Sequence, residues 1–146
     1  MSRRRLSPDR GSAALFVAVF APAMIFMAGL VIDGGGALEA RQRAADMAEQ
    51  AARAAANDCD PALLRALGEC RITAGEQQLR AIADRYVFGD GVSYGLSTAA
   101  PAPGGGYYGI EVSVRITFPT TLIGILPAFE TMTVEQTATA VAVTGR

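Results

Sequence analysis

The chain has 146 residues, a formal net charge of −1, and 51% apolar residues. This length allows one modest domain, and the near-neutral charge argues against a nucleic-acid partner. All 13 basic residues are arginine and there is no histidine, so the commonest general base and the commonest metal ligand are both missing. We therefore expect a protein that is not an enzyme and that needs no cofactor or metal.

A long apolar segment follows a basic leader, residues 1–11. From Ser12 to Ile32 the sequence contains no charged residue, and as a helix it would span about 31 Å, which matches a bilayer core of roughly 30 Å. Four arginines precede this segment, whereas Asp33, three glycines and Glu39 follow it. The positive-inside rule then predicts a single-pass cell-membrane protein with a cytoplasmic N-terminus and an extracellular C-terminus.

A cleaved secretory signal peptide is the alternative interpretation of the same segment. The apolar segment is longer than the usual apolar core of such signals, and no good cleavage site follows it. The membrane-spanning interpretation is therefore the one we carry forward.

Residues 33–58 are predicted to form an Ala-rich stalk helix, because good helix formers dominate from Ala37 to Ala56. The glycines at 34–36 predict a hinge at the membrane surface. Alanines recur on one face at helical spacing, namely Ala45, Ala48, Ala52 and Ala55. This face either packs tightly against a neighbour or belongs to a plain stalk.

The remaining residues, 59–146, are predicted to form a small extracytoplasmic α+β domain. Asp60-Pro61 is a good helix start, and this helix should stop near Gly68. The sequence from Thr73 to Glu76 fits a capping box that opens a second helix through about Arg85.

From Val92 onwards the apolar pattern has a period of two, which indicates strands. We expect a short strand to Leu96, a half-buried strand from Tyr108 to Phe118, and a strand from about Thr131 to Thr144. The last two should pair as an antiparallel hairpin, which needs the helices, a third strand or a partner chain for stability.

Two sets of residues in this domain are candidate sites. Cys59 and Cys70 lie on the exported side, where a disulfide is the default and would stabilise the fold by roughly 2–3 kcal/mol. The connection between the hairpin strands is strongly apolar. It either folds back over the sheet or contacts a partner subunit or the outer membrane surface; its candidate contact residues are Leu122, Ile123, Ile125, Leu126 and Phe129. The carboxylates Asp58, Asp60, Glu69 and Asp84 are scattered, and we expect capping or solvated roles for them.

An ordered set of segments resembles the TadE/TadG-like proteins of tight-adherence (Flp) pilus systems, in the form common in actinobacteria. The segments are Arg10–Ala14 at the entry to the apolar segment, Gly29–Gly36 at its end, and the Arg41–Asp46 and Ala51–Ala56 runs that follow. The resemblance covers about residues 9–58, and the two final strands also fit it.

This resemblance implies a structural component of a type IV-like pilus or of its assembly and secretion machinery, such as a minor pilin or pseudopilin. Its partners would be the membrane, other pilus proteins, and a prepilin peptidase that cuts between Gly11 and Ser12. One departure is Phe16, which stands where such pilins usually carry Glu; it favours the alternative of a subunit that remains in the membrane as part of the assembly platform. The alternatives are a membrane-anchored extracellular binding module unrelated to pili and, more remotely, an exported enzyme that uses carboxylates.

Overall fold

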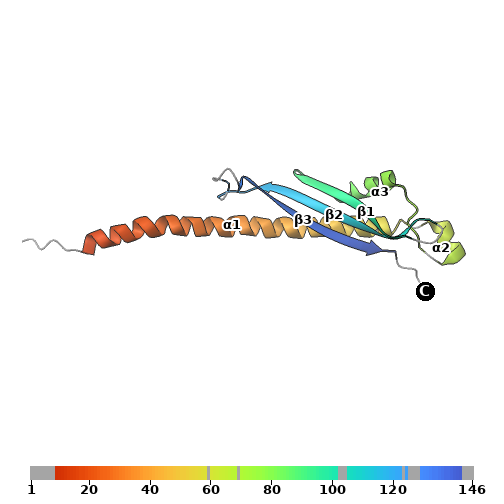
Figure 1. Cartoon of the computed structure of the whole chain (residues 1–146), viewed down its shortest axis with the longest axis horizontal. Coiled ribbons are helices and arrows are strands. Elements are labelled where there is room, and N and C mark those ends of the chain that lie inside the picture. The colour runs from red at the N-terminus through yellow and green to blue at the C-terminus, as the bar shows by residue number, and fades with distance from the viewer. Residues whose placement is uncertain are drawn as a thin grey trace, which may run out of the picture.

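The computed structural model describes residues 9–58, 60–68, 70–101, 105–122, 124 and 129–142. In chain order the elements are α1 (Asp9–Ala56), α2 (Pro61–Leu67), α3 (Glu76–Ala83), β1 (Val92–Pro101), β2 (Tyr107–Pro119) and β3 (Thr131–Val141). A long apolar N-terminal helix, two short helices and an antiparallel sheet make this an α+β fold, as predicted. The molecule is elongated, and its sheet lies along the C-terminal half of α1 (Figure 1).

Helix α1 is one continuous helix of 48 residues, which corresponds to about 72 Å. It passes through the three glycines at 34–36 without a break, so the predicted hinge is wrong. Glycine lowers helix stability by only about 1 kcal/mol relative to alanine, and packing of the following turns on the sheet offsets this cost. Pro22 also lies inside the helix.

The two short helices are capped differently. Asp60 caps α2, because its Oδ1 accepts hydrogen bonds from the backbone N–H groups of Ala62 at 2.8 Å and Leu63 at 3.4 Å. Gly68 ends α2 in the left-handed conformation, with φ of 68°, and both ends agree with the prediction. The capping box predicted for α3 is wrong: Gly75 is the N-cap, and no side chain caps this helix. The regular helix ends at Ala83, two residues before the predicted end.

The sheet has three antiparallel strands in the order β1-β2-β3. The predicted hairpin is confirmed as β2 and β3, with Val114 opposite Gln136 and Ile116 opposite Val134. The third strand, β1, continues to Pro101, well beyond the predicted end at Leu96, because its whole length pairs with β2. The stability that a bare hairpin lacks is therefore supplied within this chain, by β1 and by α1.

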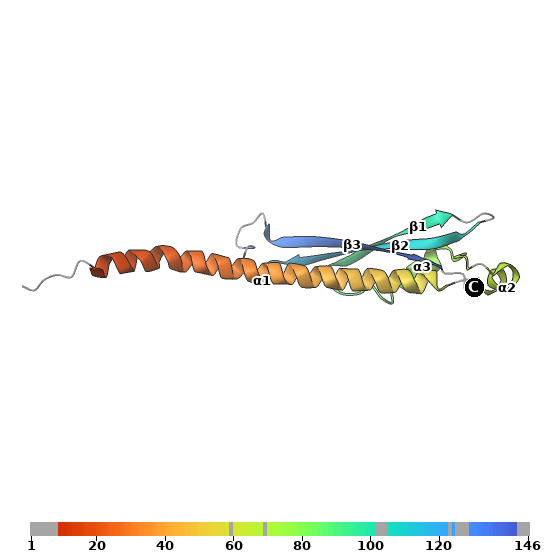
Figure 2. The same cartoon turned by 90° about the horizontal axis from the view of Figure 1, so that it is seen from below.

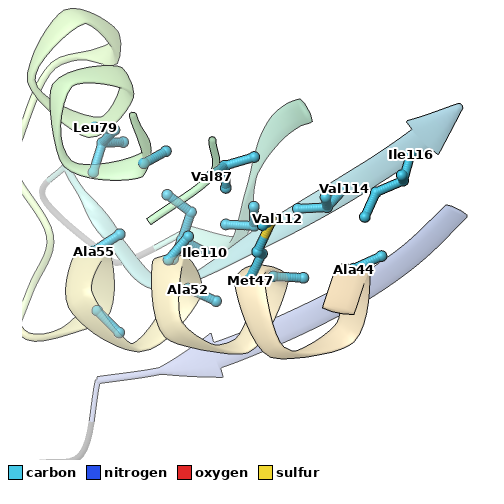
Figure 3. Close-up of a cluster of buried hydrophobic side chains, with 14 of the residues drawn as sticks. Ala44, Met47, Ala52, Ala55, Leu79, Val87, Ile110, Val112, Val114 and Ile116 are labelled. Carbon is cyan, nitrogen blue, oxygen red and sulfur yellow. The ribbon is translucent and has the colours of Figure 1, made fainter. Parts of the chain in front are cut away.

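The core lies between one face of the sheet and the helices α1 and α3 (Figure 3). Alternate residues of β2 point into it, namely Ile110, Val112, Val114 and Ile116. Opposite them lies a buried face of α1 composed of small side chains, with Ala44, Ala48, Ala51, Ala52 and Ala55 nearly inaccessible to solvent. Because alanine is thin, the helix backbone can approach the strands closely. The neighbour of the alanine face is therefore the chain's own sheet, although Ala45 is only half-buried.

The other face of the sheet is polar. Arg115 and Glu135 form an ion pair across β2 and β3 at 2.8 Å, and the hydroxyls of Thr117 and Thr133 lie 3.0 Å apart. This alternation of apolar and polar positions is typical of a sheet that is covered on one face only.

Candidate functional site

The N-terminal half of α1 carries apolar side chains that nothing in the described chain covers. From Leu15 to Ile32 its large hydrophobic residues are more than half exposed, for example Phe26 at 75% and Leu30 at 64%. Figure 2 shows this half of the helix extending away from the sheet. It is long and apolar enough to cross a membrane. An uncovered apolar surface of this size needs either lipid or protein neighbours.

Asp33 marks the point where the bare part of α1 meets the domain. It is 4% exposed, the one buried charged residue in the described chain. Its Oδ1 accepts a hydrogen bond from the Thr121 backbone N–H at 2.8 Å, and its Oδ2 accepts one from the Leu122 N–H at 3.1 Å. A buried carboxylate is tolerated when such donors satisfy it. Asp33 therefore fastens the β2–β3 connection to α1 across 88 residues of sequence.

Gly29 lies one turn before Asp33 on the same face of α1 and provides the space for this contact. A Cβ atom built on Gly29 would lie 2.7 Å from Cβ of Leu122 and 2.9 Å from its Cδ1. Real Cβ atoms do not approach so closely, so any other residue at this position would displace the Leu122 side chain. We call the contact formed by Gly29, Asp33, Thr121 and Leu122 the loop latch.

The candidate partner residues in the β2–β3 connection are only partly described. Leu122 is half-buried against α1, and Phe129 is 52% exposed. Ile123, Ile125 and Leu126 lie outside the described residues. The start of the connection therefore folds back onto the chain itself, but onto α1 rather than over the sheet, while Phe129 is accessible to a partner.

The predicted processing site lies at the start of α1. The helix begins at Asp9, so the Gly11–Ser12 peptide bond is within its first turn. Phe16, at the position where glutamate was expected from the resemblance, stacks on Phe20 one turn later, with ring centroids 4.3 Å apart. This stacked pair belongs to the exposed apolar surface, and it places no charge there.

The predicted disulfide involves one residue that is described and one that is not. Cys70 is buried, and its Sγ lies 3.9 Å from the carbonyl oxygen of Ala56 at the end of α1. Cys59 lies outside the described residues. The pairing of the two remains a prediction.

Three of the four carboxylates that are scattered in the sequence are described, and each of them has its own hydrogen-bonding partner. Asp58 accepts a hydrogen bond from Gln78 at 2.8 Å, Asp60 caps α2, and Asp84 accepts one from the Tyr94 hydroxyl; Glu69 lies outside the described residues. Burial raises the pKa of Tyr94, and its hydrogen bond to Asp84 adds to the effect. Among the described residues no three acidic or thiol side chains are grouped to hold a metal ion.

A comparison with known protein families bears directly on the helix. Residues 11–58 match the family model described as "Putative Flp pilus-assembly TadE/G-like". The predicted resemblance is thereby confirmed over this segment, which includes the bare apolar part of α1, Gly29, Asp33 and the alanine face. The match supports a role in tight-adherence pilus assembly and, with the apolar helix, association with a membrane. Neither the curated proteins nor the solved structures contain a significant match.

Sequence reasoning missed the loop latch within this TadE/G-like segment. In the sequence, Asp33 is only a charge that flanks the apolar segment, and Gly29 is only part of the run that ends it. One signal was present: an acid immediately after an apolar helix must find hydrogen-bond donors if the domain covers it. The sequence does not say that the donors belong to a connection 88 residues later.

Proposed function

We propose that the chain is a membrane-anchored structural subunit of a tight-adherence pilus or of its assembly machinery, acting as a minor pilin or pseudopilin. The observation that carries this proposal is the division of α1 into two surfaces. Its first half is apolar and bare, and its second half is covered by the sheet. The same bare surface would contact lipid before assembly and neighbouring helices afterwards. The family match over residues 11–58 supports the pilus context.

The N-terminus of this subunit would be cytoplasmic and the α+β domain extracellular. The basic leader and the acidic residues after the apolar segment support this orientation. The domain would receive a disulfide between Cys59 and Cys70 in the oxidising compartment. Phe129, which is exposed, would be available for contacts outside the chain.

Prepilin-type processing between Gly11 and Ser12 would separate a filament subunit from a permanent platform component. Phe16 favours the platform, because it cannot supply the charge that the usual glutamate brings to a neighbour in a filament. The experiment is intact-mass spectrometry of the protein from membranes and from sheared surface fibres of the native host. A mass lacking residues 1–11 in the fibres would show a filament subunit. A full-length mass confined to membranes, with or without Met1, would show an assembly component.

Deletion of the gene tests the pilus role itself. We expect the deletion strain to lose surface pili, and complementation with the full chain to restore them. A control strain carries the chain with Glu39→Gln, a change at an exposed position of α1, and should keep its pili. Normal piliation in the deletion strain would contradict the pilus role and favour a membrane-anchored binding module.

A further inference from the structure

In the sheet that the structure describes, β1 and β3 are the two edge strands and lie on either side of β2 (Figure 1). Both pair antiparallel with β2, so they run in the same direction as each other. β1 carries no charged residue, and β3 carries only Glu135. Long edge strands without blocking charges are templates for the addition of a further strand.

The backbone groups that face each edge follow from the alternation of the antiparallel ladder. The Thr117 N–H donates to the carbonyl oxygen of Gly91, just before β1, at 2.9 Å. Odd-numbered residues of β1 therefore bond to β2, and the even-numbered ones face the open edge. The Ala142 N–H, just after β3, donates to the carbonyl oxygen of Tyr108 at 2.6 Å. In β3 it is therefore the odd-numbered residues that face the open edge.

A groove lies between α1 and the open edge of β3. It is lined by Glu49 and Arg53 of α1, which form an ion pair at 2.6 Å, and by residues 136–140 of β3. Helix α3 lies on the same face of the sheet as α1, but next to β1. It carries an ion pair of its own, between Glu76 and Arg80 at 2.7 Å. One edge of the sheet thus has a groove beneath it, and the other has a helix.

We propose that β1 of one copy adds to the β3 edge of a second copy, so that the sheet continues between subunits and α3 of the first copy enters the groove of the second. The proposal rests on the membrane anchoring argued above, because copies anchored in one membrane point in the same direction and lie at the same depth. Their edge strands then meet in parallel. Pairing of two β3 edges would place the two α1 helices on opposite faces of the combined sheet and would leave both grooves empty.

Equal depth determines the register of this contact. Within one chain Leu96 is opposite Val112, and Val112 is opposite Ala138, so Leu96 of one copy comes level with Ala138 of the next. Both side chains face the core side of the sheet. At this register the Leu96 N–H meets the Thr137 carbonyl oxygen, and the Leu96 carbonyl oxygen meets the Thr139 N–H. These are the backbone groups that face the two open edges.

The same register brings opposite charges together in the groove. The later part of β1 lies beside Glu76, and its earlier part lies beside Arg80, so α3 runs opposite to β1 and to α1. In the second copy Glu76 then faces Arg53, and Arg80 faces Glu49. All four side chains are more than half exposed, so they are available to a neighbour. Such complementary charges favour one arrangement of the partners over others.

Cysteine cross-linking in membranes tests the register. Ser97 comes level with Thr139 of the next copy, and both are exposed. Two full-length chains with different affinity tags, one with Ser97→Cys and one with Thr139→Cys, are reconstituted together in phosphatidylcholine vesicles and oxidised. We expect a disulfide-linked dimer that carries both tags. Thr133→Cys in place of Thr139→Cys moves the thiol by about 20 Å along β3 and should give only the background of the wild-type chains.

A charge exchange tests the position of α3 in the groove. Glu49→Arg with Arg53→Glu reverses the charges of the groove but retains its internal ion pair. Glu76→Arg with Arg80→Glu does the same for α3. Either exchange, made in both chains, should lower the yield of mixed dimer, because like charges then face each other across the contact. The two exchanges combined should restore the yield, which a purely structural role of these residues would not do.

Flotation of the vesicles reports separately on the anchor. Chains that float with the vesicles but give no more mixed dimer than the Thr133→Cys control would overturn the shared sheet and leave the anchored subunit intact. A yield that ignores the charge exchanges, or that their combination does not restore, would overturn the docking of α3. Chains that do not float would overturn the membrane anchor, and the shared sheet with it.

Discussion

Removal of the Asp33 carboxylate should release the β2–β3 connection from α1. Asp33→Ala deletes both acceptors of the Thr121 and Leu122 N–H groups. A hydrogen bond to a charged acceptor contributes about 1.5–3 kcal/mol, and water partly replaces it here, because these N–H groups are only partly buried. We expect a net loss of about 2–3 kcal/mol, so that the connection opens roughly 30- to 150-fold more often.

Residue-resolved hydrogen exchange of the full chain in a membrane mimetic measures this opening directly. The amides of Thr121 and Leu122 should exchange faster by that factor in Asp33→Ala, while those of Val112 and Val114 in the centre of the sheet should keep their rates. Asp33→Asn retains one acceptor and should produce an intermediate effect. Glu39→Ala removes an exposed acid from the same helix and should change neither amide. Wild-type exchange at Thr121 and Leu122 in Asp33→Ala would refute the latch.

Three further predictions concern packing and titration. Gly29→Ala should displace the connection, since its Cβ would meet a loop side chain at 2.7 Å, whereas Gly35→Ala meets nothing within 4 Å and should be neutral or stabilising; hydrogen exchange of the connection compares the two. Ala48→Leu should lower the stability of the domain by about 1–3 kcal/mol through overpacking. Gln50→Leu, at an exposed position, should leave the stability unchanged. Unfolding by denaturant, followed by tyrosine fluorescence, measures the free energy of unfolding of both variants. Tyr94→Phe should remove from the ultraviolet absorbance titration a phenol that titrates above the ordinary tyrosine range, because the pKa of Tyr94 is raised by burial and by its hydrogen bond to Asp84. The stability associated with the raised pKa is present below the ordinary tyrosine pKa of about 10 and is lost as pH rises through the folded-state value, so the wild type should lose stability relative to Tyr94→Phe in alkali.

The elements could be predicted because their signals are local. A charge-free segment long enough to span a bilayer, an Asp-Pro helix start and a strict alternation from Tyr108 to Phe118 each lie within a short window of sequence. Even the alanine face followed from helical spacing. The predictions failed where a long-range contact overrides a local preference: the glycines at 34–36 are helical because the turns on both sides of them are, and β1 is long because β2 offers a partner along its whole length.

The candidate site could not be predicted from the sequence, because it is formed by contacts between residues far apart in the chain. Asp33 and Gly29 acquire their roles only when Thr121 and Leu122 return to α1, and that return is determined by the length of the hairpin relative to the helix. The apolar composition of the connection predicted that it would be covered, either by the chain itself or by something else. Its depth relative to the apolar segment required the three-dimensional register of the sheet on the helix.

The continuous helix and the loop latch together have a mechanical consequence for anchoring. With no hinge at 34–36, the direction of the apolar segment sets the direction of the sheet, because both belong to one helix or pack on it. The latch adds a second attachment, at the end of the sheet nearest the apolar segment, so the domain cannot pivot about α1 without breaking the Asp33 hydrogen bonds. The domain and its anchor should therefore move as one body, and neighbouring subunits that bind the bare half of α1 would also fix the orientation of the sheet.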